Sequence, residues 1–367
     1  MSDTFRELLK KVGSGSHTSK NLTRAEAASA TEMMLTQTAT PAQIGAFMIA
    51  HRIRRPTPTE LAGMLDCYDQ LGPRLQPIAS KHPVTIFSSP YDGRTRTAPV
   101  SPLTALVLAA ADAPAVLHGS DRMPTKYGLP FIEVWQALGL NWQLLTLDQV
   151  QAVFEQTGLG FVYQPEHFPA AQGLVPYRAQ LGKRPPLATI ELMWSPYNGP
   201  AHVVSSYVHP PTEERTQQAY AQRGTNYFTT VKGVEGSCDL PRARTAIIGL
   251  QNPDTPFERL LLHPRDFGFA DEDPPLGTPT DFHQQMKAVL AGQLNSLANS
   301  VIWNSGFYLW RSGVTETIDR GLALSQDLLL EGRVKEKVDE ITEEITRHSQ
   351  YRAPADAADS LNLQPIL

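Results

Sequence analysis

The chain has 367 residues, of which 41% are hydrophobic and 19% charged, and its formal net charge is −5. This length predicts about two domains of ordinary size, and the composition excludes a wholly disordered chain. The negative balance excludes an overall basic field, so a nucleic-acid site would have to be a local cluster of Lys and Arg. Two widely separated cysteines, Cys67 and Cys238, fit neither a disulfide framework nor a zinc site and indicate a reduced, cytoplasmic setting. The N-terminus lacks a signal-peptide pattern, and no apolar run is long enough to span a membrane.

Residues 1–75 predict a small helical domain. Apolar positions recur at helical spacing, and three segments open with a Thr that has Glu or Gln three residues later. This pattern is a capping box, in which two side chains satisfy the free amides at the start of a helix. The three pairs are Thr23 with Glu26, Thr40 with Gln43, and Thr57 with Glu60.

Residues 82–345 predict an α/β domain. Short apolar runs such as VTIF, APAVLHG, GFVYQP, HVVSSYV and TAIIGL alternate with helical patterns near 101–111, 131–139 and 147–157. Strands that alternate with helices favour a mostly parallel central sheet flanked by helices. Further helices are expected from Thr278 onward and over 293–312 and 315–331, whereas 346–367 reads as a loosely ordered tail.

An ordered set of motifs resembles the anthranilate phosphoribosyltransferase family. The set comprises TPAQIGAFMIAHRIR, VLHG, HFPA, YRAQLGKR, LLLHPRDFGF and VIWNSGFYLW, and it covers roughly residues 5 to 340. The resemblance implies a helical domain that forms homodimers, a larger α/β domain, and an active site in the cleft between them. It also implies a reaction that joins anthranilate to phosphoribosyl pyrophosphate with Mg²⁺ and releases pyrophosphate, a step of tryptophan synthesis.

The family's phosphate loop, Gly-Thr-Gly-Gly-Asp, matches Ser88, Ser89, Pro90, Tyr91 and Asp92, followed by Gly93. Bare glycine backbone lets amides approach a diphosphate, whereas Pro has no amide hydrogen and Tyr adds bulk. The resemblance therefore implies a phosphate site built from Asp92, Gly93 and side-chain charge on Arg94 and Arg96. It also places anthranilate transfer of the family's usual kind in doubt.

The family's next phosphate contact, Asn-Ile-Ser-Thr at a helix start, retains Ser101, which also reads as an ordinary N-cap. Its Lys-His-Gly-Asn turn retains His118 and Gly119. Its acidic magnesium pair matches Cys238 and Asp239, so the predicted Mg²⁺ ligands are Asp239 and Glu235.

The family's arginine on the anthranilate side matches Arg184, which stands in a basic cluster with Arg178 and Lys183. An arginine pairs well with a carboxylate or a phosphate. One hypothesis is therefore a transferase-like protein that binds a phosphorylated sugar in the cleft. The alternative is a non-catalytic homodimer that binds nucleic acid through Arg94, Arg96, Lys183 and Arg184, since the PYDGRTR loop is similar to that of a nucleic-acid-binding branch of the family. A regulatory paralogue that pairs with a true enzyme is a third hypothesis.

Overall fold

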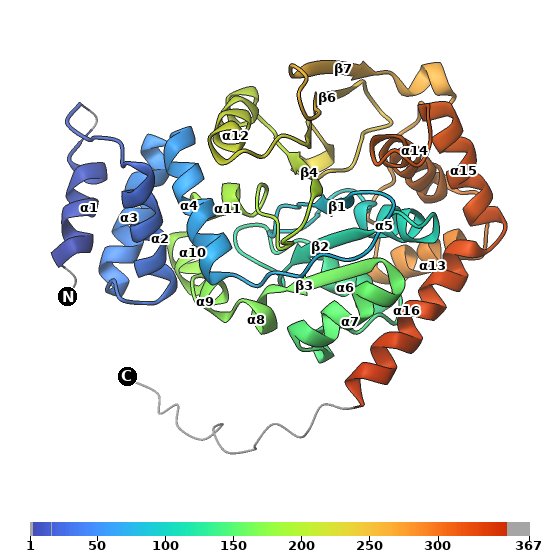
Figure 1. Ribbon diagram of the computed structural model, residues 1–367, viewed down its shortest axis with the longest axis horizontal. Coiled ribbons are helices and arrows are strands. Elements are labelled where there is room, and N and C mark those ends of the chain that lie inside the picture. The colour runs from blue at the N-terminus through green and yellow to red at the C-terminus, as the bar shows by residue number, and fades with distance from the viewer. Residues whose placement is uncertain (1–2, 16, 351–367) are drawn as a thin grey trace.

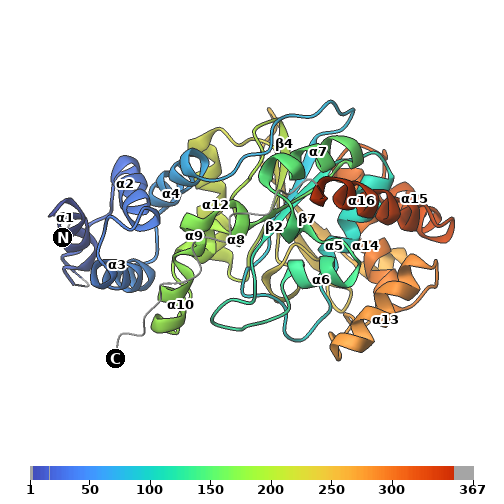
Figure 2. The ribbon, with the colours of Figure 1, turned by 90° about the horizontal axis from the view of Figure 1, so that it is seen from below.

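The computed structural model describes residues 3–15 and 17–350, which form a helical module and a larger α/β body (Figure 1). The two parts stand at opposite ends of the long axis, and α10 lies beside the module (Figure 2). The helical module consists of α1 (Asp3–Gly13), α2 (Arg24–Leu35), α3 (Pro41–Arg54) and α4 (Pro58–Leu71).

The three predicted capping boxes are all present in the module. Thr23, Thr40 and Thr57 each accept a hydrogen bond from the amide three residues later, and the Glu or Gln at that position accepts one from the Thr amide. Helix α1 was not predicted, although Phe5, Leu8 and Val12 form one buried stripe at helical spacing.

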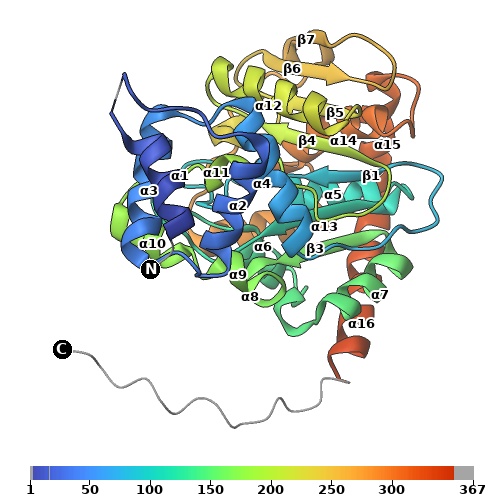
Figure 3. The same cartoon turned by 60° about the vertical axis from the view of Figure 1, so that its left-hand side comes forward.

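The α/β body is built on one sheet of seven strands in the order β3-β2-β1-β4-β5-β6-β7. Strands β1 to β5 pair in parallel, whereas β6 and β7 pair antiparallel at one edge (Figure 3). The predicted mostly parallel sheet is therefore confirmed. The strands are β1 (Val84–Phe87), β2 (Ala115–Gly119), β3 (Leu159–Tyr163), β4 (Ala201–Ser206), β5 (Phe228–Val231), β6 (Ala246–Gln251) and β7 (Glu258–Leu262).

Helices cover the sheet and join its strands. Helices α14, α15 and α16 pack on α5, and α12 packs on α4 of the module. The helices of the body are α5 (Ser101–Ala110), α6 (Phe131–Ala137), α7 (Leu147–Thr157), α8 (Gln164–His167), α9 (Pro169–Gln172), α10 (Val175–Leu181), α11 (Leu187–Ile190), α12 (Pro210–Arg223), α13 (Pro279–Leu290), α14 (Ser296–Arg311), α15 (Ile318–Leu330) and α16 (Arg333–Ser349).

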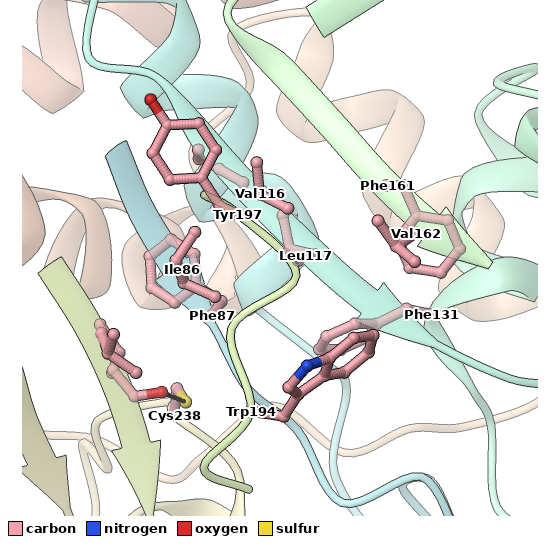
Figure 4. Close-up of a cluster of buried hydrophobic side chains, with 14 of the residues drawn as sticks. Ile86, Phe87, Val116, Leu117, Phe131, Phe161, Val162, Trp194, Tyr197 and Cys238 are labelled. Atoms are coloured by element: carbon pink, nitrogen blue, oxygen red, sulfur yellow. Dashed lines mark hydrogen bonds between the residues drawn. The ribbon is translucent and has the colours of Figure 1, made fainter. Parts of the chain in front are cut away.

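The core lies between the parallel strands and their covering helices. Apolar pairs on neighbouring strands are fully or nearly fully buried there, and Figure 4 shows them with Trp194. The pairs are Ile86 and Phe87 on β1, Val116 and Leu117 on β2, and Phe161 and Val162 on β3. Strands buried on both faces read as continuous apolar runs, which is why the sequence predicts them well.

One prediction made from the sequence needs qualification. The predicted tail began at 346, but α16 continues through Ser349; the rest of the tail, 351–367, lies outside the described residues.

No helix in the described part of the chain combines the length and apolarity needed to cross a bilayer.

The order of the strands fixes where a ligand can bind. Strand β1 has β2 on one side and β4 on the other, so the connections leave β1 in opposite directions along the sheet. In open α/β sheets, ligands bind at such a point, beyond the carboxyl ends of the strands. The loop over 88–100 follows β1 at this edge, and the loops after β2, β4 and β5 end beside it.

Candidate functional site

The side chain of Tyr91 fills the space between the loop after β1 and the turn after β2. Tyr91 is buried, and a hydrogen bond of 2.5 Å joins its hydroxyl to Nδ1 of His118. The cavity beside the two side chains has a volume of only about 10 Å³. A cavity of that size holds about one water molecule, so a phosphoribosyl group has no room there.

Burial also sets the protonation of this pair. It lowers the pKa of His118 to about 3 and raises that of Tyr91 well above its ordinary value. The edge of the His118 ring also packs against Trp194, with 5.2 Å between the ring centroids. At neutral pH both members of the pair are uncharged, so His118 serves as a packed, hydrogen-bonded residue and offers no positive charge to a ligand.

Arg94 is buried beneath the same loop. Its Nη1 donates to Oδ2 of Asp239 at 2.5 Å and to Oγ of Ser237 at 2.6 Å, and its Nη2 donates to Thr97 and to the carbonyl of Ala98. The side chain is only 3% exposed. The sequence suggested that Arg94 would face a ligand anion; in the structure its partner is a carboxylate of the same chain.

The carboxylate of Glu235 occupies the outer part of the loop. Three backbone amides donate to it, from Thr95 at 3.3 Å, Arg96 at 3.0 Å and Thr97 at 2.9 Å. The hydroxyls of Thr95 and Thr97 donate as well, at 3.0 and 2.8 Å. Burial by itself would raise the pKa of Glu235, but the hydrogen bonds from Thr97 and the charge of Arg94 outweigh it and lower the pKa to about 2.

Asp239 lies deeper than Glu235 and is also fully engaged. Its two oxygens accept from Arg94, from the amide of Val100 at 3.0 Å and from the hydroxyl of Ser101. Helix α5 has Val100 at its N-cap position, and Ser101 makes no capping bond. The predicted N-cap role of Ser101 is therefore replaced by a bond to Asp239.

The two predicted magnesium ligands do not fit a metal ion. Arg94 already stands between them, with Nη1 on Asp239 and Nε 3.6 Å from Oε1 of Glu235. Cys238 is buried, its thiol donates to the carbonyl of Ser88 at 2.7 Å, and burial raises its pKa. A protonated thiol and two occupied carboxylates are poor ligands for a hard cation. Within residues 3–15 and 17–350, no cluster of three or more His, Cys, Asp and Glu side chains is arranged to hold a metal.

Asp92 and Gly93 also have structural partners. Asp92 is buried and pairs with Nη2 of Arg184. Gly93 has a φ of +74°, and a Cβ there would lie 2.5 Å from the backbone carbonyl carbon of Gly128. A glycine is therefore needed for the loops to pass each other, whether or not a phosphate binds.

A large open cleft near the site lies between the end of α3, residues 184–192 and the start of α12. Its volume is about 620 Å³. Four arginines line it: Arg52, Arg55, Arg184 and Arg215. No carboxylate of the described residues lies within ion-pair distance of Arg52, Arg55 or Arg215. The cleft thus collects positive charge at the boundary between the helical module and the α/β body.

Two of the arginines in the cleft, Arg55 and Arg215, repel each other. Burial lowers the pKa of Arg215, and the nearby charge of Arg55 lowers it further. Arg184 is the member that connects the cleft to the loop, through its ion pair with Asp92. Clefts in which charges of one sign are crowded together are typical of sites that bind a ligand of the opposite charge.

The structure separates the residues that the sequence grouped together. Arg178 is buried against Glu191 and does not line the cleft, and Lys183 is exposed. The side chain of Arg96 is 79% exposed, with Nε 3.8 Å from Glu235. Arg52 and Arg55 belong to the basic run HRIRR at the end of α3, where cations also complement the helix dipole. Arg215, on a polar helix, carried no signal in the sequence.

Comparisons with known proteins agree with this architecture. The family model "Glycosyl transferase family, helical bundle domain" matches residues 6–72, and "Glycosyl transferase family, a/b domain" matches residues 92–335. An anthranilate phosphoribosyltransferase of Verminephrobacter eiseniae is 27% identical over 316 residues, which are 84% of this chain and 90% of the relative. One from Burkholderia mallei is 25% identical over 304 residues, 82% and 87% of the two chains.

Solved structures show the same fold at lower identity. Anthranilate phosphoribosyltransferase from Thermus thermophilus is 19% identical with a TM-score of 0.75, covering 94% of this chain and all of the other. The enzyme from Saccharomyces cerevisiae in complex with PRPP and Mg is 14% identical with a TM-score of 0.80, covering 95% and 99% of the two chains. Because both family models match in order and together span most of the chain, this protein belongs to the glycosyl transferase family of the anthranilate phosphoribosyltransferases.

Proposed function

We propose that this protein binds a phosphorylated pentose of the phosphoribosyl pyrophosphate class, or a related anion, in the cleft between its helical module and its α/β body. The observation that carries the proposal is the set of four arginines in one open cleft of about 620 Å³. An arginine fork matches two oxygens of a phosphate, and several forks together hold a diphosphate in a fixed orientation. The yeast relative, solved in complex with PRPP and Mg, supports this class of ligand.

The position of the arginines favours an anion that enters from the cleft. Arg184 already spends one guanidinium nitrogen on Asp92 and has others to offer. Arg52 donates its Nε to the carbonyl of Arg184 at 2.9 Å, which ties the end of α3 to the opposite wall. An anion between these walls would join the two parts of the molecule and offset the repulsion between Arg55 and Arg215.

We propose further that anthranilate transfer, if the protein performs any transfer, does not use the loop over 88–93 in the family's manner. Tyr91 fills the space beside that loop. The guanidinium of Arg94 is bound to Asp239, and the carboxylate of Glu235 accepts from the loop's backbone amides. The magnesium requirement implied by the family stays a prediction. Asp239 and Glu235 are poorly placed to meet it, because both already bind the chain itself.

Calorimetric titration tests the proposal directly. Phosphoribosyl pyrophosphate should bind with and without Mg²⁺, ribose 5-phosphate should bind more weakly, and unphosphorylated ribose should not bind. The double variant Arg55→Ala/Arg215→Ala should lose most of the heat. Unchanged binding in that variant would move the site elsewhere, and no heat with any phosphorylated sugar would contradict the proposal.

A nucleic-acid backbone is the second candidate ligand. The open shape of the cleft favours it, since arginines stand on both walls: Arg52 and Arg55 on α3 and its C-cap, and Arg184 and Arg215 across from them. Arg94 is too deeply buried to take part, so the predicted contacts reduce to Arg184 with Lys183 and the exposed Arg96. A mobility assay with single- and double-stranded DNA at two salt concentrations tests this candidate, since phosphate contacts make affinity fall steeply with salt.

Pairing of two chains through the helical module and a cytoplasmic setting stay predictions drawn from the sequence and the family. The module presents Ile53, a residue that is 73% exposed at the end of α3. Sedimentation of the protein and of Ile53→Glu would test the pairing. A dimer that persists unchanged in the variant would place the interface away from the end of α3.

A further inference from the structure

We infer that residues 95–97 form a second anion site, which Glu235 keeps filled, and that the site takes an inorganic oxyanion such as phosphate or sulfate once that carboxylate is removed. Nothing in the proposed role of the arginine cleft requires this site. None of residues 95–97 lines the cleft, and the site uses backbone amides and hydroxyls rather than arginine forks.

The hydrogen-bond pattern around Glu235 is that of a bound oxyanion. Three consecutive amides and two hydroxyls donate to its two oxygens at 2.8 to 3.3 Å. Successive amides that point into one concavity form a nest for an anion. Each of the two Thr residues donates through both its amide and its hydroxyl, which concentrates five donors on one small group.

The charges around this nest also suit an oxyanion. Arg94 Nε lies 3.6 Å, Arg96 Nε 3.8 Å and Lys126 Nζ 3.9 Å from the oxygens of Glu235. The side chains of Glu235 and Arg94 are only 2% and 3% exposed, so Arg94 acts on the carboxylate with little screening by water, whereas the more exposed Lys126 and Arg96 act on it more weakly. Because Arg94 is shared with Asp239, two cations would remain without a full partner if Glu235 lost its charge.

The turn that carries Glu235 places its carboxylate against the amides of residues 95–97. Glu235 has a φ of 52° within the short turn Val234–Gly236, a conformation that residues other than Gly, Asn and Asp seldom adopt. The turn is closed tightly: a Cβ on Gly233 would lie 1.8 Å from the carbonyl oxygen of Ser237. The contacts of the carboxylate with the loop hold the turn in this conformation, so the loop and the turn stabilise each other.

Replacement of Glu235 by Ala should therefore leave a nest of the size and charge of a small oxyanion. Titration of E235A with inorganic phosphate and with sulfate is the test, and the wild-type protein and E331A, which removes an exposed glutamate, are the controls. E235A should bind phosphate at least about tenfold more tightly than either control, because charge-assisted bonds to amides and cations are freed. Equal phosphate affinity in all three proteins, with E235A folded, would overturn the inference.

A second set of measurements separates this inference from the proposed function. The added substitutions Arg55→Ala/Arg215→Ala should leave the phosphate binding gained by E235A unchanged, because the cleft arginines do not touch the nest. If the gained binding disappears with those arginines, the phosphate sits in the cleft and the inference is wrong. A failure of the wild-type protein to bind any sugar phosphate would contradict the proposed function but not this site.

The inference can be tested even if E235A folds poorly. Phosphate should then raise its melting temperature, whereas chloride at the same ionic strength should not; an equal effect of the two salts would contradict the inference. In the wild-type protein, hydrogen exchange should show the amides of Arg96 and Thr97 strongly protected although they lie in a loop. Exchange of both at the rate of an open chain would show that the nest is not held by Glu235.

Discussion

The guanidinium of Arg94 donates to the carboxylate of Asp239 at 2.5 Å, and both side chains are almost fully buried. The pair joins the loop after β1 to the loop after β5 at the edge of the sheet where open α/β folds generally bind ligands. Its cation and anion come from one chain and neutralise each other. The buried charge of the loop is therefore neutralised without a ligand.

Replacement of Arg94 by Ala should destabilise the protein strongly. Asp239 would be left buried without its cation, and the loss of one partner of a buried ion pair costs about 3–5 kcal/mol of unfolding free energy. Denaturant unfolding measures it. Arg265→Ala, at an exposed arginine, is the control and should change the free energy by less than about 0.5 kcal/mol.

The same variant gives a test of the metal prediction. With Arg94 gone, no cation would stand between Asp239 and Glu235, and Mg²⁺ or Mn²⁺ should restore part of the lost stability. The melting temperature of R94A should rise with divalent cation, whereas that of the wild-type protein should not. An equal rise in both would mean that the ion binds elsewhere.

Stability should fall as the solution is acidified from about pH 6.5, because of His118. Burial lowers its pKa to about 3, so the unfolded chain takes up a proton at a higher pH than the folded one. The contribution is complete above the ordinary pKa and falls by about 1.4 kcal/mol for each pH unit below it, until the folded pKa is reached. His118→Gln should flatten this slope, whereas His17→Gln, at an exposed position, should leave it unchanged.

Other titrating groups also contribute to the pH dependence of stability, and their contributions must be distinguished from that of His118. His202 and His167 also have lowered pKa values through burial, so part of the slope should survive in the His118 variant. Glu60 and Glu235 have pKa values of about 2, and their contribution is lost only below about pH 4.5. A slope between pH 6.5 and 5 that His118→Gln does not alter would contradict the assignment.

The hydroxyl of Tyr91 should matter for stability and not for binding in the cleft. Tyr91→Phe leaves the ring in place but removes the bond to His118, which should cost about 1–2 kcal/mol since Nδ1 is then buried without a partner. Tyr177→Phe is the matched control, because its hydroxyl bonds to Gln37 at the surface. Titration with phosphoribosyl pyrophosphate should give the same affinity for both variants.

Arg215 should show the opposite balance. Its pKa is lowered by burial and by Arg55, so Arg215→Ala should cost no stability, or raise it slightly. Binding of a sugar diphosphate should weaken by about tenfold, the loss expected for one charge-assisted contact. A variant with normal affinity would remove Arg215 from the site.

Much of the fold could be predicted from the sequence because its signals are local. The capping boxes at Thr23, Thr40 and Thr57 act within one turn, and buried parallel strands read as apolar runs. Strand β7 and helix α12 were missed for the same reason. The first is an exposed edge strand, and the second is a polar helix whose packing on α4 no local pattern reveals.

The site could be predicted only in part because its partners are distant in sequence. The loss of glycines in the loop and the bulk of Tyr91 were visible in the sequence. Arg94 and Asp239 are 145 positions apart and meet only because β1 and β5 end at the same edge of one sheet. Sequence reasoning therefore assigned both to an external ligand, whereas the structure pairs them with each other.

The central claim is that the loop is filled by the chain's own Tyr91, Arg94 and Glu235, so that a phosphate ligand binds among the cleft arginines. A crystal structure of the protein soaked with phosphoribosyl pyrophosphate and Mg²⁺ tests it most directly. The account predicts density beside Arg55, Arg184 and Arg215, with Glu235 still bonded to the amides of residues 95–97. Pyrophosphate bound to the backbone of residues 88–93, with Arg94 and Glu235 displaced, would contradict it.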